Sequence, residues 1–242
     1  MVKHRKIVLT VLICCYNAGK FLDRCLGSLV KQSIPSSFYK ILFINDASTD
    51  ESLKIAESYK MDLKNLSLLN NKRNMGLVQS CNKALDNIDT SFFMRLDADD
   101  YLSLNALDKI EEELKYLEKE DFIIFQRWDV DNNKALSFKV TNDMYTWIAV
   151  GTVFNKDAVI SVGGYSKEYW EEYDLYIRLL ERGFKYKVSP SRIYYYSRGH
   201  GSMTAGCQKN KLGLKNLSRK WGTGILRKYG DFKKLSEYYA MR

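Results

Sequence analysis

Short apolar runs alternate with segments of helical periodicity along the first half of the chain. The runs span residues 7–13, 40–44, 66–69 and 92–96. After the first run, the apolar side chains fall on one helical stripe, made by Phe21, Leu22, Cys25, Leu26, Leu29 and Val30. Such alternation is typical of βαβ units, in which a crossover helix returns the chain to a parallel sheet. We therefore predict an α/β fold whose N-terminal half is a Rossmann-like, largely parallel sheet flanked by helices.

The second half of the chain has a looser pattern. A charged amphipathic segment at 104–119 predicts a helix, and a short apolar run at 122–125 predicts a strand. A second amphipathic segment at 170–183 ends at a glycine, as helices often do. Two further short strands are expected at 185–188 and 193–196. The less regular pattern favours a mixed sheet in this half.

The chain shows no internal repeat, low-complexity linker or clear domain boundary. We interpret residues 1–205 as one domain, with halves at about 1–103 and 104–205. Residues 206–242 are rich in lysine and arginine and predict a basic amphipathic helical extension. Its apolar positions include Leu214, Leu217, Trp221 and Leu226. Such a helix either lies on an anionic membrane surface or packs its apolar side on the domain, and the sequence leaves both interpretations open.

Composition and charge narrow the classes of protein to which the chain can belong. The 242 residues are 45% hydrophobic, as in ordinary globular proteins, and carry a formal charge of +9. No nucleic-acid-binding motif accompanies this charge, so we expect no nucleic-acid partner. Five cysteines without metal-ligand or disulfide spacing favour a reducing compartment. No stretch approaches the ~20 apolar residues that span a bilayer. We therefore expect a cytoplasmic protein, membrane-associated on the cytoplasmic face if its tail binds lipid.

Three carboxylates follow the apolar run 92–96 directly. Asp97, Asp99 and Asp100 therefore lie together at the carboxyl end of a predicted strand. Crowded carboxylates repel one another, and a hard cation relieves that repulsion. Oxygen ligands of this kind suit Mg²⁺ or Mn²⁺. The cluster thus predicts a divalent metal site, and a solvated acidic turn is the alternative.

Polar residues also follow the first two predicted strands. Ligands of open α/β sheets bind where the carboxyl ends of the strands meet, so these residues belong to one candidate site. Tyr16 is suited to stack on a base, and Asp46 is suited to accept a hydrogen bond from a base or ribose. The alternatives are that Tyr16 is an aromatic residue at the edge of the core and that Asp46 is an ordinary turn residue.

Four motifs in fixed order resemble the family 2 glycosyltransferases, which have the GT-A fold. The resemblance covers roughly residues 6–204. It rests on Tyr16-Asn17 and Ile44-Asn45-Asp46-Ala47-Ser48-Thr49-Asp50, on Asn74-Met75-Gly76 with Asn82, on Leu96-Asp97-Ala98-Asp99-Asp100, and on Gly163-Gly164-Tyr165 followed by Trp170-Glu171-Glu172-Tyr173-Asp174-Leu175. Ordered agreement of several motifs is far more specific than any one of them.

The resemblance implies where a nucleotide diphosphate sugar and a metal ion bind. The implied donor contacts are Cys15, Tyr16, Asn17, Asp46, Asn74, Gly76, Asn82, Arg95, Asp97, Ala98 and Asp99. Asp99 is the leading ligand for Mn²⁺ or Mg²⁺, and Asp97, Asp100 and His200 are the further candidates.

The resemblance also implies a catalytic base and an acceptor site. Glu172 takes the position of the family's base, which is usually an aspartate, and Glu171 and Asp174 remain candidates. The alternative is an acidic first helical turn that only complements the helix dipole. The candidate acceptor contacts are aromatic or hydroxyl side chains of the second half, namely Trp147, Thr152, Tyr165 and Trp170. Packing in the core is the alternative for each of them.

The activity implied by the resemblance is metal-dependent, inverting sugar transfer. The expected donor is a UDP-sugar carrying a hexosyl or N-acetylhexosaminyl group, and the expected acceptor is a hydroxyl of a glycan or lipid-linked molecule in surface polysaccharide or glycoconjugate synthesis. A nucleotidyltransferase is one alternative, although Tyr16 to Lys20 supply little of the glycine-rich basic loop it needs. A catalytically weak sugar-binding descendant is the other, because Glu172 replaces the usual aspartate.

Overall fold

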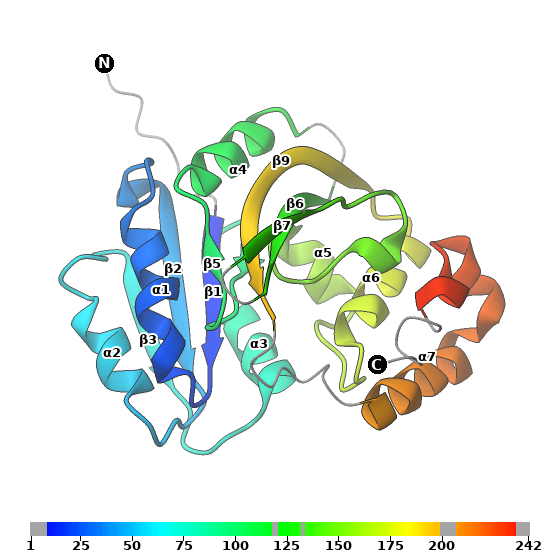
Figure 1. Cartoon of the computed structure of the whole chain (residues 1–242), viewed down its shortest axis with the longest axis horizontal. Coiled ribbons are helices and arrows are strands. Elements are labelled where there is room, and N and C mark those ends of the chain that lie inside the picture. Colours follow the sequence, from blue (N-terminus) through cyan, green and yellow to red (C-terminus); the bar gives the residue numbers. More distant parts are fainter. Residues whose placement is uncertain (1–8, 118–120, 132–133, 199–206, 236–242) are drawn as a thin grey trace.

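The computed structural model describes residues 9–117, 121–131, 134–198 and 207–235. Within them, the chain forms a three-layer arrangement in which helices cover both faces of one mixed sheet (Figure 1). The N-terminal half of the sheet is parallel, as predicted. Its strands are β1 (Leu9–Cys15), β2 (Tyr39–Asn45), β3 (Leu66–Asn70) and β4 (Phe92–Arg95), arranged in the order β3-β2-β1-β4.

The second half continues the same sheet with mixed strand directions. Its path runs from β4 through β8, β6 and β9 to β5, and β7 pairs with β6. The β4·β8, β6·β8, β6·β7 and β5·β9 pairs are antiparallel, whereas β6 and β9 are parallel. The strands are β5 (Tyr101–Leu102), β6 (Phe122–Asp131), β7 (Lys134–Phe138), β8 (Thr152–Asn155) and β9 (Tyr186–Ser197).

Strand β9 corrects the prediction of two separate short strands. It is continuous from Tyr186 to Ser197, but its pairing with β6 is irregular. The pairing advances from Val188 to Arg192 on β9 while β6 advances only from Ile124 to Gln126. Pro190 lies in this bulge, where its missing N–H disrupts no regular ladder. The proline and two serines broke the apolar pattern in the sequence without ending the strand.

Strand side chains alternate between two apolar cores. In β1, Val11 and Ile13 face one core, and Leu12 between them faces the other. The first core is covered by α1 (Gly19–Val30), α2 (Ser52–Ser58) and α4 (Ala106–Lys115). The second core is covered by α3 (Leu77–Leu85), α5 (Lys156–Ser161), α6 (Glu171–Glu181) and α7 (Cys207–Lys228). Helices on both faces hold the carboxyl ends of the parallel strands in fixed positions at one edge.

The predicted helical tail is α7, at the end of the molecule opposite α2 (Figure 1). Its apolar residues Leu214, Leu217 and Leu226 are buried in the second core, so the packing alternative holds. They are therefore not available for insertion into lipid. The helix bends at Gly222, whose φ of 71° lies outside the helical region. Among the described helices, none combines the length and hydropathy that crossing a membrane requires.

Candidate active site

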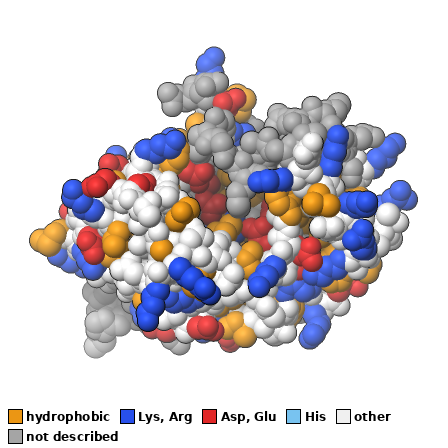
Figure 2. Space-filling model, turned by 90° about the horizontal axis from the view of Figure 1, so that it is seen from below, with side chains coloured by type: hydrophobic (Ala, Val, Ile, Leu, Met, Phe, Trp, Pro, Cys, Tyr) orange, Lys and Arg blue, Asp and Glu red, His pale blue; other side chains and the backbone are white. Residues whose placement is uncertain are grey.

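A cleft of about 840 Å³ opens at the carboxyl ends of β1, β2 and β4. Its walls come from the end of β1, the loop before α3, the acidic turn after β4 and the first residues of α6. In Figure 2, acidic side chains lie in a hollow near the centre of this face, and lysine and arginine side chains stand on the surface around it. The cleft therefore combines an acidic floor with a basic surround.

Asp46 forms the floor of the donor side and is only 3% exposed. Burial alone would raise the pKa of its carboxyl group, but hydrogen bonds outweigh burial and hold this pKa below its usual value. The Asn71 side chain donates at 2.7 Å, and the backbone N–H groups of Met75 and Gly76 donate at 2.9 and 2.8 Å. Asp46 is thus an ionised acceptor that also fixes the loop before α3.

Tyr16 and Asn17 directly follow β1 at the rim of the cleft, and Cys15, the last residue of β1, is 1% exposed and also lines it. Tyr16 is 50% exposed, so a face of its ring is available to a planar group. Asn17 has a φ of 49°, and its side-chain oxygen accepts from the Thr49 N–H at 2.8 Å. Ala47 at the end of β2 has a φ of 59°. Left-handed non-glycine residues cluster at functional sites, because only a well-determined surrounding structure maintains them.

The acidic turn after β4 brings its three aspartates together but uses them differently. Asp97, Asp99 and Asp100 present ligand atoms within 4.8 Å of one another. Asp100 is 1% exposed, and its two oxygens accept from the Tyr194 hydroxyl at 2.8 Å and the Ser197 N–H at 2.7 Å. Burial and the neighbouring aspartates raise its pKa. Asp97 and Asp99 line the cleft, whereas Asp100 anchors the turn to β9.

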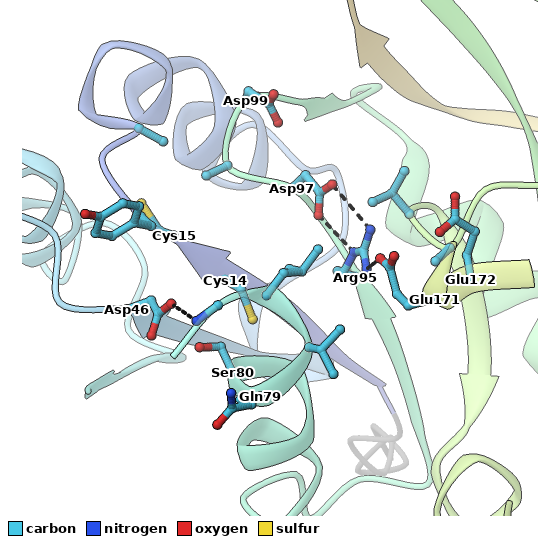
Figure 3. A pocket seen from close by; sticks show the side chains of 18 of the residues that line it. Cys14, Cys15, Asp46, Gln79, Ser80, Arg95, Asp97, Asp99, Glu171 and Glu172 are labelled. Carbon is cyan, nitrogen blue, oxygen red and sulfur yellow. Dashed lines mark hydrogen bonds and ion pairs between the residues drawn. The ribbon is translucent and has the colours of Figure 1, made fainter. Parts of the chain in front are cut away.

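Arg95 joins the acidic turn to the first residues of α6 (Figure 3). Its side chain is 7% exposed; Nε lies 2.9 Å from Asp97 Oδ1, and an Nη atom lies 3.3 Å from Glu171 Oε1. Burial raises the pKa of Asp97 to about 6, although Arg95 lowers it and Asp99 raises it further. Arg95 lines the cleft as predicted, but its guanidinium group is engaged by two protein carboxylates.

A divalent cation fits the Asp97 and Asp99 carboxylates by the chemistry of their donor atoms. Both side chains line the cleft, and hard oxygen ligands are those that Mg²⁺ and Mn²⁺ prefer. A bound cation would also relieve the repulsion that raises the pKa of Asp97. His200, the fourth predicted ligand, lies outside the described residues.

The three acidic residues at the start of α6 are sorted by their partners. Glu171 is 6% exposed and paired with Arg95. Asp174 is fully buried, and burial would raise its pKa, but hydrogen bonds outweigh burial and lower it. It accepts from Trp221 Nε1 at 2.9 Å, from Lys220 at 2.7 Å and from Arg178 Nε at 2.9 Å. Asp174 is not among the residues that line the cleft, and three partners already bond its carboxylate.

Glu172 is the member of this group with the properties of a base in the cleft. It is partly exposed and lines the cleft beside Glu171 (Figure 3). Burial raises its pKa well above the usual carboxylate range, and the negative charge of Glu171 raises it further. A carboxylate with a raised pKa accepts a proton near neutral pH more readily than an ordinary one. Of the three predicted candidates for the base, Glu171 and Glu172 line the cleft, and the choice of base stays a prediction.

The predicted acceptor residues mostly pack the core beneath the cleft. Trp147, Thr152 and Tyr165 are at most 3% exposed and do not line the cleft, whereas Trp170 does. Trp147 packs among the rings of Phe122, Tyr176 and Tyr186. These positions are correctly assigned to the second half, but their apolar surroundings bury them.

Other donor-side predictions divide in the same way. Asn74 and Gly76 line the cleft, as do Asp97, Ala98 and Asp99. Asn82 does not, because its amide holds the backbone of Tyr165 through two hydrogen bonds of 2.8 Å. Sequence reasoning missed further lining residues that carry no motif signal of their own; they include Phe21, Val78, Gln79, Ile148, Lys167, Glu168, Tyr169 and Tyr196.

The sequence matches one family profile over most of the described core. Residues 10–197 match the family described as glycosyl transferase family 2. The chain is also similar to the amylovoran biosynthesis glycosyltransferase AmsE of Erwinia amylovora, with 27% identity over 193 residues that cover 72% of this chain and 70% of that relative. An uncharacterized glycosyltransferase of Haemophilus influenzae is 35% identical over 117 residues, which are 48% of this chain and 34% of the relative. The chain thus spans about a third of that longer relative.

Solved structures of similar fold include nucleotide-sugar complexes. S. aureus TarS 1–349 in complex with UDP-GlcNAc aligns with a TM-score of 0.73 and 18% identity over 92% of this chain and 71% of that one. The mannosyltransferase PcManGT from Pyrobaculum calidifontis, in complex with GDP-Man and Mn²⁺, aligns with a TM-score of 0.74 and 13% identity over 99% and 73%. These likenesses confirm the expected GT-A fold.

Proposed function

Because the chain belongs to glycosyl transferase family 2 and is a glycosyltransferase, we propose that it transfers a hexosyl or N-acetylhexosaminyl group, with inversion, from a UDP-sugar to an acceptor hydroxyl. The observation that carries this proposal is the placement of Asp97, Asp99 and Glu172 on the walls of one cleft. Asp97 and Asp99 would bind the cation that accompanies the leaving diphosphate. Glu172 would accept the proton of the attacking hydroxyl. The complex of S. aureus TarS with UDP-GlcNAc supports uracil as the first choice of base.

The donor half of the cleft would hold the nucleotide. Tyr16 presents an exposed ring at the rim for stacking on a base. The ionised Asp46, on the floor of the cleft, would accept a hydrogen bond from an N–H group of the base or an O–H group of the ribose. Asp97 and Asp99 would hold Mn²⁺ or Mg²⁺, which when bound supplies positive charge to the leaving diphosphate. Arg95 keeps Asp97 in place through its 2.9 Å ion pair. Fixed positions of this kind lower the entropic part of the barrier.

Glu172 would accept the proton of the attacking acceptor hydroxyl. The acceptor oxygen forms its bond to the anomeric carbon as the bond from that carbon to the diphosphate oxygen breaks, and the proton goes to the Glu172 carboxylate. Its raised pKa makes it a stronger base than an ordinary glutamate. Glu171 is a poorer candidate for the base, because its ion pair with Arg95 holds its carboxylate against the wall of the cleft.

We place the acceptor among glycans or lipid-linked precursors of surface polysaccharide or glycoconjugates. The Erwinia amylovora relative, an amylovoran biosynthesis glycosyltransferase, supports this class. The proposed location is the cytoplasm. Because Leu214, Leu217 and Leu226 are buried, contact of α7 with anionic lipid would use mainly its exposed lysines and arginines. No nucleic-acid partner is proposed.

Release of nucleoside diphosphate from a panel of donors tests this function. UDP-, GDP- and dTDP-sugars are each incubated with the protein, with Mn²⁺ or with EDTA, and with or without a mixture of glycan and lipid-linked acceptors. We expect one nucleotide class to be consumed, at a rate that depends on metal and rises with acceptor. Tight donor binding without turnover under every condition would contradict transfer and favour a sugar-binding protein.

A further inference from the structure

We propose that α7 is a positioning element for the acceptor side of the cleft, acting through the segment that we name the acceptor strap, residues 164–170. This inference rests on the proposed function. Within the strap, Lys167, Glu168, Tyr169 and Trp170 line the cleft just before Glu172. The strap is held at its first residues by α3 and at its last residues by α7, and the second contact gives the C-terminal helix an influence on the reaction.

The first end of the strap is fixed by the donor half of the protein. Asn82 donates to the Tyr165 carbonyl oxygen at 2.8 Å and accepts from the Tyr165 N–H at 2.8 Å. Gly164 has a φ of 68°, and a Cβ atom there would lie 2.5 Å from the Asn82 side-chain oxygen. A glycine at this position thus permits the close approach. The strap therefore leaves the donor half in one defined direction.

The last end of the strap packs directly on the backbone of α7. Gly213 faces both strap aromatics, since a Cβ atom there would lie 2.4 Å from Tyr169 Cδ1 and 2.9 Å from Trp170 Cδ1. The Tyr169 hydroxyl donates to Asn210 Oδ1 at 2.9 Å, and Asn210 is 1% exposed. Only a residue without a side chain at position 213 lets the two rings lie against the helix. Both rings also line the cleft. The position of α7 therefore determines where the Tyr169 and Trp170 side chains lie in the cleft wall.

A second set of contacts ties α7 to the helix that carries Glu172. Lys220 and Trp221 both bond to Asp174 Oδ1, at 2.7 and 2.9 Å, and Lys220 Nζ also lies 3.4 Å from Glu168 Oε1 of the strap. Asp174 is two residues beyond Glu172 in the first turn of α6. The same helix therefore fixes the strap and the turn that carries the proposed base. A shift of α7 would change the space between the acceptor and Glu172.

The proposed donor contacts lie on elements other than α7, and the 3.3 Å ion pair between Arg95 and Glu171 is their link to the first turn of α6. Asp46 is held by the loop before α3, and the acidic turn is held by Arg95 and β9. Perturbing α7 should therefore lower acceptor use and leave donor binding intact. Because a displacement of about 1 Å can cost up to ~100-fold in rate, we expect a fall of about tenfold or more in kcat/KM for the acceptor.

Two glycines of α7 provide a matched pair of variants. Gly213→Ala forces Tyr169 and Trp170 to move, whereas Gly224→Ala adds the same methyl group where no atom lies within 4 Å. Trp221→Phe keeps a ring but removes the N–H that Asp174 accepts, and it replaces Gly213→Ala if that variant does not fold. For each variant we would measure nucleoside diphosphate affinity, kcat/KM for the acceptor, and backbone hydrogen exchange of residues 164–170.

We expect Gly213→Ala to lose acceptor efficiency and to speed hydrogen exchange in the strap, with donor affinity within about twofold of wild type. Gly224→Ala should match wild type in all three measurements. Equal behaviour of the two variants, or equal losses of donor and acceptor affinity, would overturn the inference. The rate of hydrogen exchange in residues 164–170 measures how firmly α7 holds the strap, and this measurement needs no catalytic turnover. If the wild type transfers no sugar, the proposed function fails, while the exchange comparison still decides whether α7 holds the strap.

Discussion

The proposed donor and acceptor sides of the cleft hold most of their carboxylates by different kinds of contact, although Asp97 on the donor side is paired with Arg95. On the donor side, Asp46 is held mainly by backbone N–H groups of one loop, and Asp100 by groups of β9. On the acceptor side, Glu171 and Asp174 are held by cationic side chains: Arg95 and Lys220 come from distant parts of the chain, and Arg178 lies one turn along α6 from Asp174. A backbone N–H group is present in every residue except proline, so a contact of this kind tolerates many sequences. Each ion pair, in contrast, depends on two particular side chains.

The difference supports the proposal that Glu172, rather than Glu171 or Asp174, is the base. Glu171 and Asp174 have cationic partners within 3.3 Å, and Glu172 between them lines the cleft with a raised pKa. A pair of groups whose surroundings push their pKa values apart is typical of acid and base assignments in active sites. The acceptor side thus obtains its chemistry from neighbouring charges. Variants of both sides test this difference.

Glu172→Gln removes the proposed base and should have the largest effect. We expect sugar transfer to fall by about 10²–10⁴-fold, because general-base assistance typically contributes that much. Donor binding should stay within about twofold, since the donor contacts lie on other elements. Steady-state rates and calorimetric donor affinities measure the two quantities. Glu172→Asp is the matched variant, since it keeps the carboxylate with a shorter side chain, and it should retain more transfer than Glu172→Gln.

Asp174→Asn should act on stability rather than on chemistry. Loss of its charge leaves Arg178 and Lys220 without their common partner, and breaking a largely buried pair of this kind costs about 2–4 kcal/mol of unfolding free energy. Urea unfolding of the apoprotein measures the change. Asp157→Asn, at an exposed position of α5, should change the same quantity by no more than about 0.5 kcal/mol. A stable but inactive Asp174→Asn protein would instead make Asp174 the base.

The pH dependence of transfer should follow the ionisation of Glu172. The base acts only when deprotonated, and its pKa is raised, so kcat rises with pH through a pKa above the usual carboxylate range. Below that pKa the rate should fall about tenfold per pH unit. A profile of kcat at saturating donor and acceptor measures the midpoint, and Glu172→Gln should abolish this limb. A rate that stays constant down to the usual range of a glutamate would show that another group takes the proton.

Arg24→Ala should give the smallest effect and tests the support of the acidic turn. Arg24 donates to the Asp99 carbonyl oxygen at 2.8 Å and to Ser197 Oγ at 2.9 Å, and its guanidinium carbon lies 4.7 Å from the Tyr101 ring centroid. Loss of one charged hydrogen bond of this kind is worth about 1.5 kcal/mol. We expect metal-dependent donor affinity to fall about tenfold by calorimetry. Lys31→Ala, an exposed cation just after the same helix, should leave that affinity unchanged.

Much of the donor half could be predicted from the sequence because its signals are local. Apolar runs gave β1 to β4 within two residues, and the residues after β1, β2 and β4 line the cleft as predicted. The acidic turn was visible because three aspartates interrupt an apolar run. Parallel strands place their carboxyl ends at one edge, so chain order alone brings these residues together.

The acceptor half resisted prediction because its signals are tertiary. The choice among Glu171, Glu172 and Asp174 depends on Arg95 and Trp221, which lie 76 and 47 positions away in the chain from the carboxylates that they contact. The burial of Trp147 depends on three rings from three other elements. The amphipathic pattern of α7 fits both a membrane surface and a domain core, and only packing distinguishes them.

The metal dependence of nucleoside diphosphate binding is the decisive test of the proposed cation site at Asp97 and Asp99. Titration calorimetry of UDP and GDP with wild type and Asp99→Ala, each in Mn²⁺ and in EDTA, gives four affinities per nucleotide. The account predicts that Mn²⁺ tightens binding of one nucleotide to wild type by at least about tenfold, roughly 1.4 kcal/mol, and that Asp99→Ala loses this gain. Equal affinities in Mn²⁺ and EDTA for wild type, or a gain that survives in Asp99→Ala, would contradict it.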